Sequence, residues 1–438
     1  MIKCIGIIRE TKNEWERRAP LIPADVKSLL AGQPVQFVVQ PSDLRIFREE
    51  EYLAQGAAIC DDLSGCEMII GIKEIKIKDL LTQKIYLFFS HTIKGQSYNM
   101  PMLRKIMELE DTLIDYERMI NEKGQRLIYF SYHAGLAGVI DTLWAYGKKM
   151  ALEGIESPFS KIKHSLQYPD LPHTKTALQE VGEEIRIHGL PPAISPCVIG
   201  ITGYGNVSHG VQHLLDILPV TSIEPAEIAG VRKSKTRNRH TIFKTVFKEE
   251  HMVESIIKGQ PFDLQDYYKN PDKYRSRFES YLDHLNILVN ASFWNNQYPR
   301  HVTRKYIREL YARETMPTLR VIGDISCDVQ GGVECTLKNT TPGNPVFTYL
   351  PDRDEACDGF EGHGLVIMAV DNLPSEIPAE ASAYFSSILK NLLPDLLQAD
   401  YSLDFNDLNL PPSLKKAVVV YHGELTPDYQ YLKKYLDH

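Results

Sequence analysis

The chain contains the stretch Val198-Ile-Gly-Ile-Thr-Gly-Tyr-Gly-Asn-Val-Ser-His-Gly210, in which an apolar run is followed by closely spaced glycines and then by a helical apolar pattern. This order predicts a strand, a tight turn and a helix. Glycines in such a turn let the backbone approach a pyrophosphate, and the unpaired amides of the helix N-terminus attract its charge. We therefore expect a dinucleotide site that includes Gly203, Gly205, Asn206, Val207 and Ser208.

The usual dinucleotide pattern is altered at one position, because Ser208 replaces its third glycine. A small side chain there still permits close helix packing, and a glycine turn without a ligand is the alternative. Further along, an apolar segment ends in Glu224, at the distance where an acid binds the adenosine ribose hydroxyls. Glu224 favours NAD, but Arg232, Lys233 and Lys235 could meet a 2'-phosphate, so NAD and NADP both stay open.

Length and composition indicate an ordinary globular protein with two domains, since the chain has 438 residues, of which 43% are hydrophobic and 24% charged. A net charge of -8 gives no indication of nucleic acid binding. The seven cysteines include no C-x-x-C pair, so we expect neither a disulfide scaffold nor a metal site. Without a signal peptide or an apolar run of roughly 18 residues, the sequence predicts a cytoplasmic protein that does not span a membrane.

Short apolar runs alternate with helical patterns, which is typical of an α/β protein with parallel sheets. The expected strands are 3–8, 35–39, 68–72 and 85–89 in a first domain, and 197–201, 287–290 and 320–325 in a second. A long apolar helix is expected over 134–152, and the chain after 374 is expected to be largely helical, at 379–397 and 411–420. The polar region 233–277 reads as an exposed insertion.

Ionisable residues follow two of the expected strands, Lys73 after one and His91 after the other. Both would emerge at the carboxyl edge of a parallel sheet, where α/β proteins build their sites, and together they make an acid/base pair. Taken alone, each could be a surface or satisfied polar residue. Glu117 could hold Lys73 in its charged form or be an ordinary carboxylate. Asp324 and Asp328 follow a strand of the second domain, where they would face the nicotinamide end of a dinucleotide.

Nine short motifs in one order resemble the lysine-ketoglutarate reductase and saccharopine dehydrogenase family, and more loosely alanine dehydrogenase. They include Glu-Arg-Arg-Ala-Pro-Leu (16–21), Gly-Ile-Lys-Glu (71–74), Phe-Phe-Ser-His-Thr-Ile-Lys (88–94), Gly-Tyr-Gly-Asn-Val-Ser (203–208) and Asp-Asn-Leu-Pro (371–374). The resemblance implies two Rossmann-like domains that flank an active-site cleft: a substrate domain of residues 1–132 plus 342–438, and a dinucleotide-binding domain of residues 133–341.

The reaction that the resemblance implies is the reversible condensation of lysine with 2-oxoglutarate and reduction of the imine to saccharopine. Lys73 and His91 would be the acid/base pair, tuned by Glu74 and Glu117. The residues expected to assist or hold the substrate are Arg17, Arg18, Lys94 and Gln96. We also consider a homo-oligomer. The alternatives are an alanine dehydrogenase and a dinucleotide sensor without catalysis. The bifunctional members of the family also carry a glutamate-forming dehydrogenase, and whether a separate protein supplies that step stays open.

Overall fold

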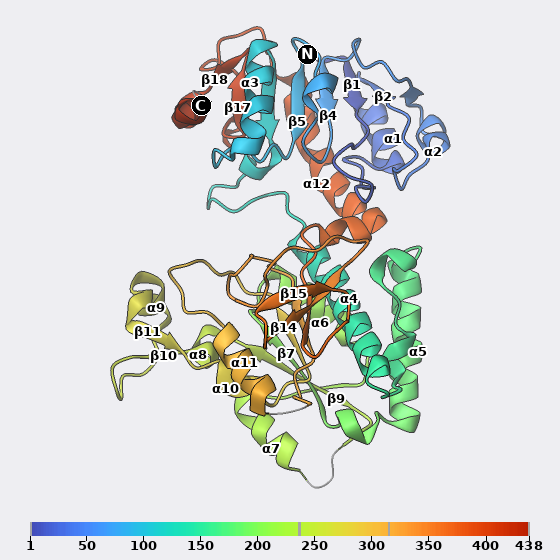
Figure 1. The fold of residues 1–438 in the computed structure, drawn as a ribbon. Helices are drawn as coiled ribbons and strands as arrows, with labels where there is room; N and C mark the ends of the chain where they lie inside the picture. Colours follow the sequence, from blue (N-terminus) through green and yellow to red (C-terminus); the bar gives the residue numbers. More distant parts are fainter. Residues whose placement is uncertain (1, 235–237, 314–315, 437–438) are drawn as a thin grey trace. The chain divides into compact units, whose positions relative to one another are not determined.

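The computed structural model describes residues 2–234, 238–313 and 316–436, which divide into two compact units. The first unit joins both chain ends, Met1–Phe130 and Pro378–His438, and the second is Ser131–Ile377. Each unit is an α/β assembly around its own eight-stranded sheet (Figure 1). The prediction of two Rossmann-like α/β domains is confirmed.

The sheet of the first unit has the strand order β18-β17-β6-β5-β4-β1-β2-β3, in which β1 to β6 are parallel and β17 runs antiparallel to β6. Its strands are β1 (Cys4–Ile7), β2 (Gln36–Val39), β3 (Ala58–Ile59), β4 (Met68–Ile70), β5 (Ile85–Phe88), β6 (Thr112–Asp115), β17 (Val418–Tyr421) and β18 (Glu424–Leu425). Its helices are α1 (Pro23–Gly32), α2 (Glu49–Leu53), α3 (Met100–Glu108), α12 (Pro378–Gln398), α13 (Pro412–Lys415) and α14 (Lys433–Leu436). Strands β4 and β5 are buried along their whole length, as parallel strands covered on both faces are.

The sheet of the second unit has the order β15-β14-β16-β13-β12-β7-β9-β8, parallel from β16 to β8. Its strands are β7 (Cys197–Thr202), β8 (Val220–Ser222), β9 (Ile242–Phe247), β12 (Ile287–Asn290), β13 (Val321–Asp324), β14 (Val346–Leu350), β15 (Glu355–Asp358) and β16 (Leu365–Met368), and β10 (Val253–Ser255) pairs separately with β11 (Tyr274–Ser276). Its helices are α4 (Ser131–Leu152), α5 (Leu171–His188), α6 (Asn206–Leu215), α7 (Ile228–Lys233), α8 (Glu249–Met252), α9 (Leu264–Lys269), α10 (Glu279–Leu282) and α11 (Arg304–Arg313).

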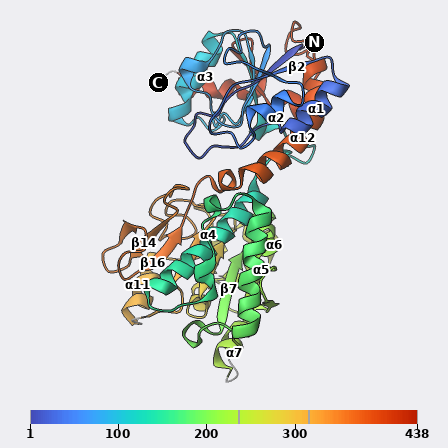
Figure 2. The ribbon, with the colours of Figure 1, turned by 90° about the vertical axis from the view of Figure 1, so that its right-hand side faces the viewer.

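Helices α4, α5 and α6 lie together over one face of the second sheet, as the view turned by 90° shows (Figure 2). Gly210 allows this packing, because a Cβ at that position would lie 2.1 Å from the carbonyl oxygen of Tyr132 in α4. The close approach of the two backbones fixes the position of α6, whose N-terminus follows the glycine turn. Within the described residues, no helix is both long and apolar enough to cross a membrane.

Three predictions of the sequence analysis need correction. Residues 342–377 lie in the second unit, because β14 and β16 hydrogen bond into its sheet, so the domain boundary moves from 341/342 to 377/378. The helix predicted over 411–420 is short and gives way to strand β17, which suits its β-branched run. The region 233–277 is not wholly an exposed insertion, because it contains β9, a strand in the interior of the sheet.

Candidate active site and cofactor site

The glycine turn of the second unit has the predicted form of strand β7, a turn and helix α6. Gly203 has φ +81°, and a Cβ there would lie 3.0 Å from the carbonyl oxygen of Ala291, so only glycine fits without strain. Ser208 is buried, and its Oγ accepts a hydrogen bond from Gln212 within α6. Ser208 therefore fills the helix-packing position of the third glycine and does not line the cavity described next.

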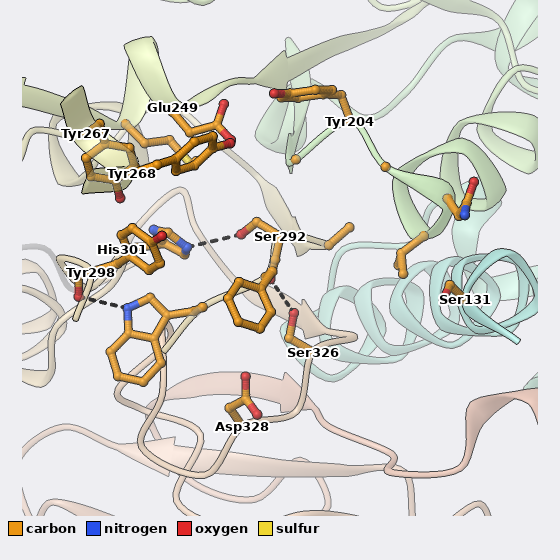
Figure 3. A pocket seen from close by; sticks show the side chains of 18 residues that line it. Ser131, Tyr204, Glu249, Tyr267, Tyr268, Ser292, Tyr298, His301, Ser326 and Asp328 are labelled. Carbon is orange, nitrogen blue, oxygen red and sulfur yellow. Dashed lines mark hydrogen bonds between the residues drawn. The ribbon is translucent and has the colours of Figure 1, made fainter. Parts of the chain in front are cut away.

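A cavity of about 660 Å³ opens in front of this turn (Figure 3). The turn and the start of α6 form one wall, through Gly203, Gly205, Asn206 and Val207. Aromatic side chains form much of the remainder, namely Tyr204, Tyr267, Tyr268, Phe293, Trp294 and Tyr298. His301 also lines the cavity, and burial lowers its pKa to about 4, so its ring is neutral at neutral pH. A backbone cradle with flat apolar walls fits a dinucleotide.

Glu249 lines the cavity beside the turn, whereas the predicted Glu224 is not among the lining residues. Strand β9 pairs directly with β7, and Glu249 follows its end and lines the cavity. Glu224 instead follows the outer strand β8, where its backbone amide donates to Glu227 in a capping arrangement. The hydroxyl of Tyr268 donates to Glu249 Oε1 over 2.8 Å. Glu249 thus lies at the end of the strand that pairs with β7, and its carboxylate lines the cavity.

The two predicted acids after β13 have different environments. Asp324 is buried and accepts hydrogen bonds from Asn290 Nδ2 at 2.8 Å and Thr336 Oγ1 at 2.6 Å, and burial raises its pKa to about 6. Asp324 therefore has a structural role, because its carboxylate joins the end of β13 to Asn290 at the end of β12 and to Thr336. Asp328 lines the cavity beside Ser326. Only Asp328 is thus placed to face a bound dinucleotide.

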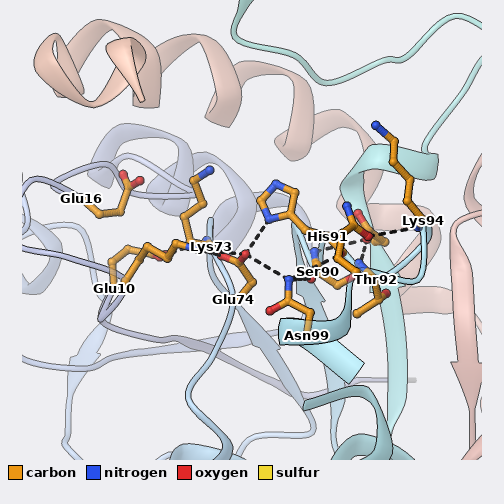
Figure 4. A network of polar contacts seen from close by, with 12 residues as sticks. Glu10, Glu16, Lys73, Glu74, Ser90, His91, Thr92, Lys94 and Asn99 are labelled. Atoms are coloured by element: carbon orange, nitrogen blue, oxygen red, sulfur yellow. Dashed lines mark hydrogen bonds and ion pairs between the residues drawn. The ribbon is translucent and has the colours of Figure 1, made fainter. Parts of the chain in front are cut away.

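In the first unit, Lys73 and His91 follow the ends of the neighbouring strands β4 and β5. Their side chains point the same way from this sheet edge (Figure 4). Burial lowers the pKa of Lys73, and the nearby Arg18 lowers it further. A lysine in this state is unprotonated more often near neutral pH than an exposed one, so it is more available as a general base. His91 has φ +48°, an unusual backbone conformation for a residue with a side chain, and such conformations cluster at functional sites.

Glu74 lies between His91 and Lys12 and contacts both side chains. One of its oxygens lies 2.7 Å from His91 Nδ1, and both lie 3.0 Å from Lys12 Nζ. Asn99 also donates to Glu74 Oε1, over 3.3 Å. Although burial alone would raise the pKa of Glu74, its contacts with His91 hold that pKa far below the usual range. The carboxylate orients the imidazole through Nδ1, so Nε2 is the nitrogen left for a substrate.

Glu10 holds the backbone from which Lys73 projects, a role that the sequence analysis did not assign. Its carboxylate accepts hydrogen bonds from the backbone amides of Ile72 at 2.5 Å and Lys73 at 3.0 Å. Burial, with the charge of Glu16, raises the pKa of Glu10 to about 7. No local spacing in the sequence reveals that Glu10 contacts backbone amides more than 60 positions away.

The basic residues that were predicted to bind the substrate lie in different surroundings. Arg18 is buried, and its guanidinium donates to Glu16 through Nε at 2.7 Å and Nη2 at 2.5 Å while stacking on Phe130. Arg17 is half-buried. Lys94 is exposed on the loop after His91, where its backbone amide donates to Gln96 Oε1 over 3.2 Å. Glu117 is buried and forms an ion pair with Arg126, which favours the ordinary carboxylate among the two alternatives considered for it.

The second unit also buries a cluster of side chains that could ligate a metal, composed of Asp141, His164 and Glu376. His164 Nε2 lies 3.2 Å from Asp141 Oδ2 and 3.8 Å from Glu376 Oε1. Burial and the adjacent Asp141 raise the pKa of Glu376 well above its usual range, whereas the charge of His164 leaves the pKa of Asp141 lowered despite its burial. The raised pKa of Glu376 favours its neutral form, so the buried cluster avoids two adjacent negative charges.

These features define the two-domain dinucleotide-binding fold of dehydrogenases, and comparisons with known proteins specify the family. The family description "Alanine dehydrogenase/PNT, N-terminal domain" matches residues 6–137, and its C-terminal counterpart matches residues 241–428. The chain belongs to the alanine dehydrogenase/PNT family.

Among sequence relatives, the alpha-aminoadipic semialdehyde synthase of Arabidopsis thaliana is 36% identical over 98% of this chain and 41% of its own length. The mitochondrial enzyme of that name from Rattus norvegicus is 32% identical over 98% of this chain and 47% of its length. The chain therefore spans less than half of the length of these synthases. The saccharopine dehydrogenase (NAD(+), L-lysine-forming) of Neurospora crassa is 25% identical over 89% of this chain and 90% of its length.

Two solved structures share the fold at low sequence identity. An L-alanine dehydrogenase superimposes with a TM-score of 0.61 and 16% identity, covering 99% of both chains. The transhydrogenase from Sinorhizobium meliloti superimposes with a TM-score of 0.56 and 14% identity, covering 97% of this chain and 100% of that one. The agreement supports the fold of both units.

Proposed function

We propose that this protein reversibly condenses L-lysine with 2-oxoglutarate and reduces the imine to saccharopine with a nicotinamide cofactor. The observation that carries the proposal is the placement of Lys73 and of a His91 oriented by Glu74 at the ends of neighbouring strands, in a chain similar over 98% of its length to aminoadipic semialdehyde synthases. The similarity to a saccharopine dehydrogenase over nearly the whole of both chains supports the same reaction.

The side chains of the first unit can move the protons that this reaction requires. The substrate ε-ammonium must lose a proton before it attacks the ketone, and Lys73 with its lowered pKa is the base for this step. The carbinolamine must then lose water, and His91 gives the proton through Nε2 while Glu74 stabilises the charged ring through Nδ1. Lys12 shares the charge of Glu74 and keeps the carboxylate in position.

The bound cofactor would supply the hydride that reduces the imine carbon. The residues that fit it are the cradle at Gly203 and Gly205, the aromatic walls, and Glu249 for the ribose hydroxyls. We further propose that NAD is preferred, since the carboxylate of Glu249 would repel a 2'-phosphate. Arg232 is committed elsewhere, because it donates to the backbone oxygens of Pro196 and His284. Lys233 is exposed on α7, and Lys235 lies outside the described residues.

The test follows the oxidation of NADH and of NADPH by absorbance, with 2-oxoglutarate plus lysine, then with 2-oxoglutarate plus ornithine, and then with pyruvate plus ammonia. We expect lysine-dependent oxidation of NADH. Activity with pyruvate and ammonia alone would assign an alanine dehydrogenase, and no activity under any condition would favour a sensor. A cytoplasmic location and a homo-oligomer stay predictions, to be tested by fractionation and by light scattering.

A further inference from the structure

Two cysteines of the first unit lie in direct contact at the amino edge of its sheet. Cys4 is the first residue of β1, and Cys66 lies just before β4, the strand that pairs with β1 (Figure 1). Their Sγ atoms are 2.7 Å apart, although 62 positions separate the two residues in the chain. Nonbonded carbon atoms prefer about 3.5–4.0 Å, and sulfur is larger, so the two atoms are inside ordinary contact distance. A disulfide needs a further approach of only about 0.6 Å.

We propose that Cys4 and Cys66 are a redox-active pair that forms an intramolecular disulfide by exchange with small disulfides. The parallel pairing of β1 with β4 holds the two segments side by side, and the two sulfur atoms already lie 2.7 Å apart. The register pairs Ile5 with Met68, and the backbone amide of Cys4 donates to the Glu67 side chain over 2.8 Å. Closing the bond therefore requires no rearrangement of the strands.

The two thiols differ in access, which assigns an order to the reaction. Cys4 is partly exposed and lines a cavity of about 1,090 Å³ together with Gly65 and Glu67. Cys66 is only 2% exposed, and burial raises the pKa of its thiol. A small reagent therefore reaches Cys4 from the cavity, whereas Cys66 reacts only with a sulfur already attached at Cys4.

The exchange balances with a low-molecular-weight disulfide such as glutathione disulfide as the oxidant. The thiolate of Cys4 attacks one sulfur of this disulfide, its S–S bond breaks, and one small thiol leaves. The sulfur of Cys66 then attacks Cys4 Sγ in the mixed disulfide, and its thiol proton passes to the second small thiol as that thiol leaves. The two protein thiols lose two electrons, the small disulfide gains them, and the two thiol protons end on the released thiols.

The bond would tie β1 to β4 at the edge opposite Lys73, which follows the other end of β4. We therefore expect a change in stability rather than in turnover, because a cross-link over a long loop restricts the unfolded chain. This inference does not depend on the proposed reaction.

The experiment equilibrates the reduced full-length protein with glutathione buffers of rising oxidised fraction, blocks free thiols by alkylation and maps disulfides by mass spectrometry of peptides. We expect the protein to lose two of its seven thiols and to yield a Cys4–Cys66 cross-linked peptide. The oxidised protein should also unfold at a temperature higher by roughly 2–8 °C. Cys60→Ser is the matched control, because Cys60 is an exposed cysteine of the same unit, and it should leave the cross-link unchanged.

Cys66→Ser should stop the reaction at a mixed disulfide on Cys4, and Cys4→Ser should prevent oxidation of Cys66. If a serine variant does not fold, the peptide map of the wild-type protein decides. The proposal is overturned if wild-type Cys4 accumulates as the mixed disulfide, if Cys60 replaces Cys66 in the cross-link, or if both thiols remain free where Cys60 is already oxidised.

Discussion

Replacing Glu376 by glutamine should make the second unit more stable at neutral pH, although it alters a completely buried carboxyl. Glu376 has a pKa raised by burial and by Asp141, so the folded chain keeps it protonated while the unfolded chain ionises it near pH 4.3. The direction of the pH effect follows from the difference between the two pKa values of Glu376. Because its pKa is higher in the folded chain than in the unfolded chain, its full contribution to the free energy of unfolding is present below the unfolded pKa. That contribution is lost as the pH rises towards the folded pKa. The loss is roughly 1.4 kcal/mol for each pH unit in that window.

Glutamine does not titrate, so Glu376→Gln removes this pH dependence. At pH 5 the variant should be about 1 kcal/mol less stable than the wild type, since one amide hydrogen is left without an acceptor. As the pH rises towards 7 and 8 the order should reverse, because only the wild type loses stability through this linkage. Asp141→Asn should instead cost about 3–5 kcal/mol, as it leaves His164 and the two Ser165 donors with too few acceptors.

The assay is urea unfolding at pH 5, 6, 7 and 8, followed by the fluorescence of Trp144, whose ring lies 5.3 Å from that of His164. With Trp15 and Trp294 changed to Phe, Trp144 is the last of the three tryptophans and reports on this unit alone. Glu361→Gln is the control, because it makes the same chemical change at an exposed position of the same unit. A stability difference between Glu376→Gln and the wild type that is constant with pH would refute the protonated state of Glu376.

The other predictions concern the two sites. Lys73→Met and His91→Gln should each lower turnover by about 10²–10⁴-fold, and Lys78→Met, at an exposed position nearby, should not; near wild-type turnover in either would remove that residue from the mechanism. Glu74→Gln should lower turnover by about 10–100-fold, because an amide cannot hold both His91 and Lys12, and NADH affinity measured by fluorescence should stay unchanged. Glu249→Gln should weaken NADH binding by about 10-fold and narrow its preference over NADPH, whereas Glu224→Gln should do neither; the opposite pattern would return the ribose site to Glu224.

The sequence predicts those parts of the sites that depend on one strand and the turn that follows it. The glycine turn has a local pattern with a physical reason at each position, and the structure reproduces its strand, turn and helix. Lys73 and His91 could also be placed, because the ends of neighbouring parallel strands meet at one edge of a sheet. Glu10 could not be found in this way, since its bonds to the backbone of Ile72 and Lys73 join distant segments.

The domain boundary was missed for a related reason. The strands between 342 and 377 have the same apolar character as those of either domain, so composition does not tell which sheet they join. Pairing decides it: Val321 of β13 lies opposite Val366 of β16, and β14 continues from β16. The resemblance to a family with both chain ends in one domain gave the correct architecture. Only the hydrogen bonds between strands show where the chain leaves the second unit and returns to the first.

The order of the strands in the sheet explains why Glu249, and not the predicted Glu224, lines the cavity. Counting about 20 residues from the glycine turn stops at the end of β8, because β8 is the first strand after α6. In the sheet, however, β9 lies between β7 and β8, so the end of β9 is the one beside the turn. The polar character of region 233–277 does not reveal strand β9, in which Lys244 is buried and forms an ion pair with Asp216 at 2.6 Å. In a Rossmann-like sheet, the ribose-binding acid should therefore be sought after the strand that pairs with the first one, wherever that strand occurs in the sequence.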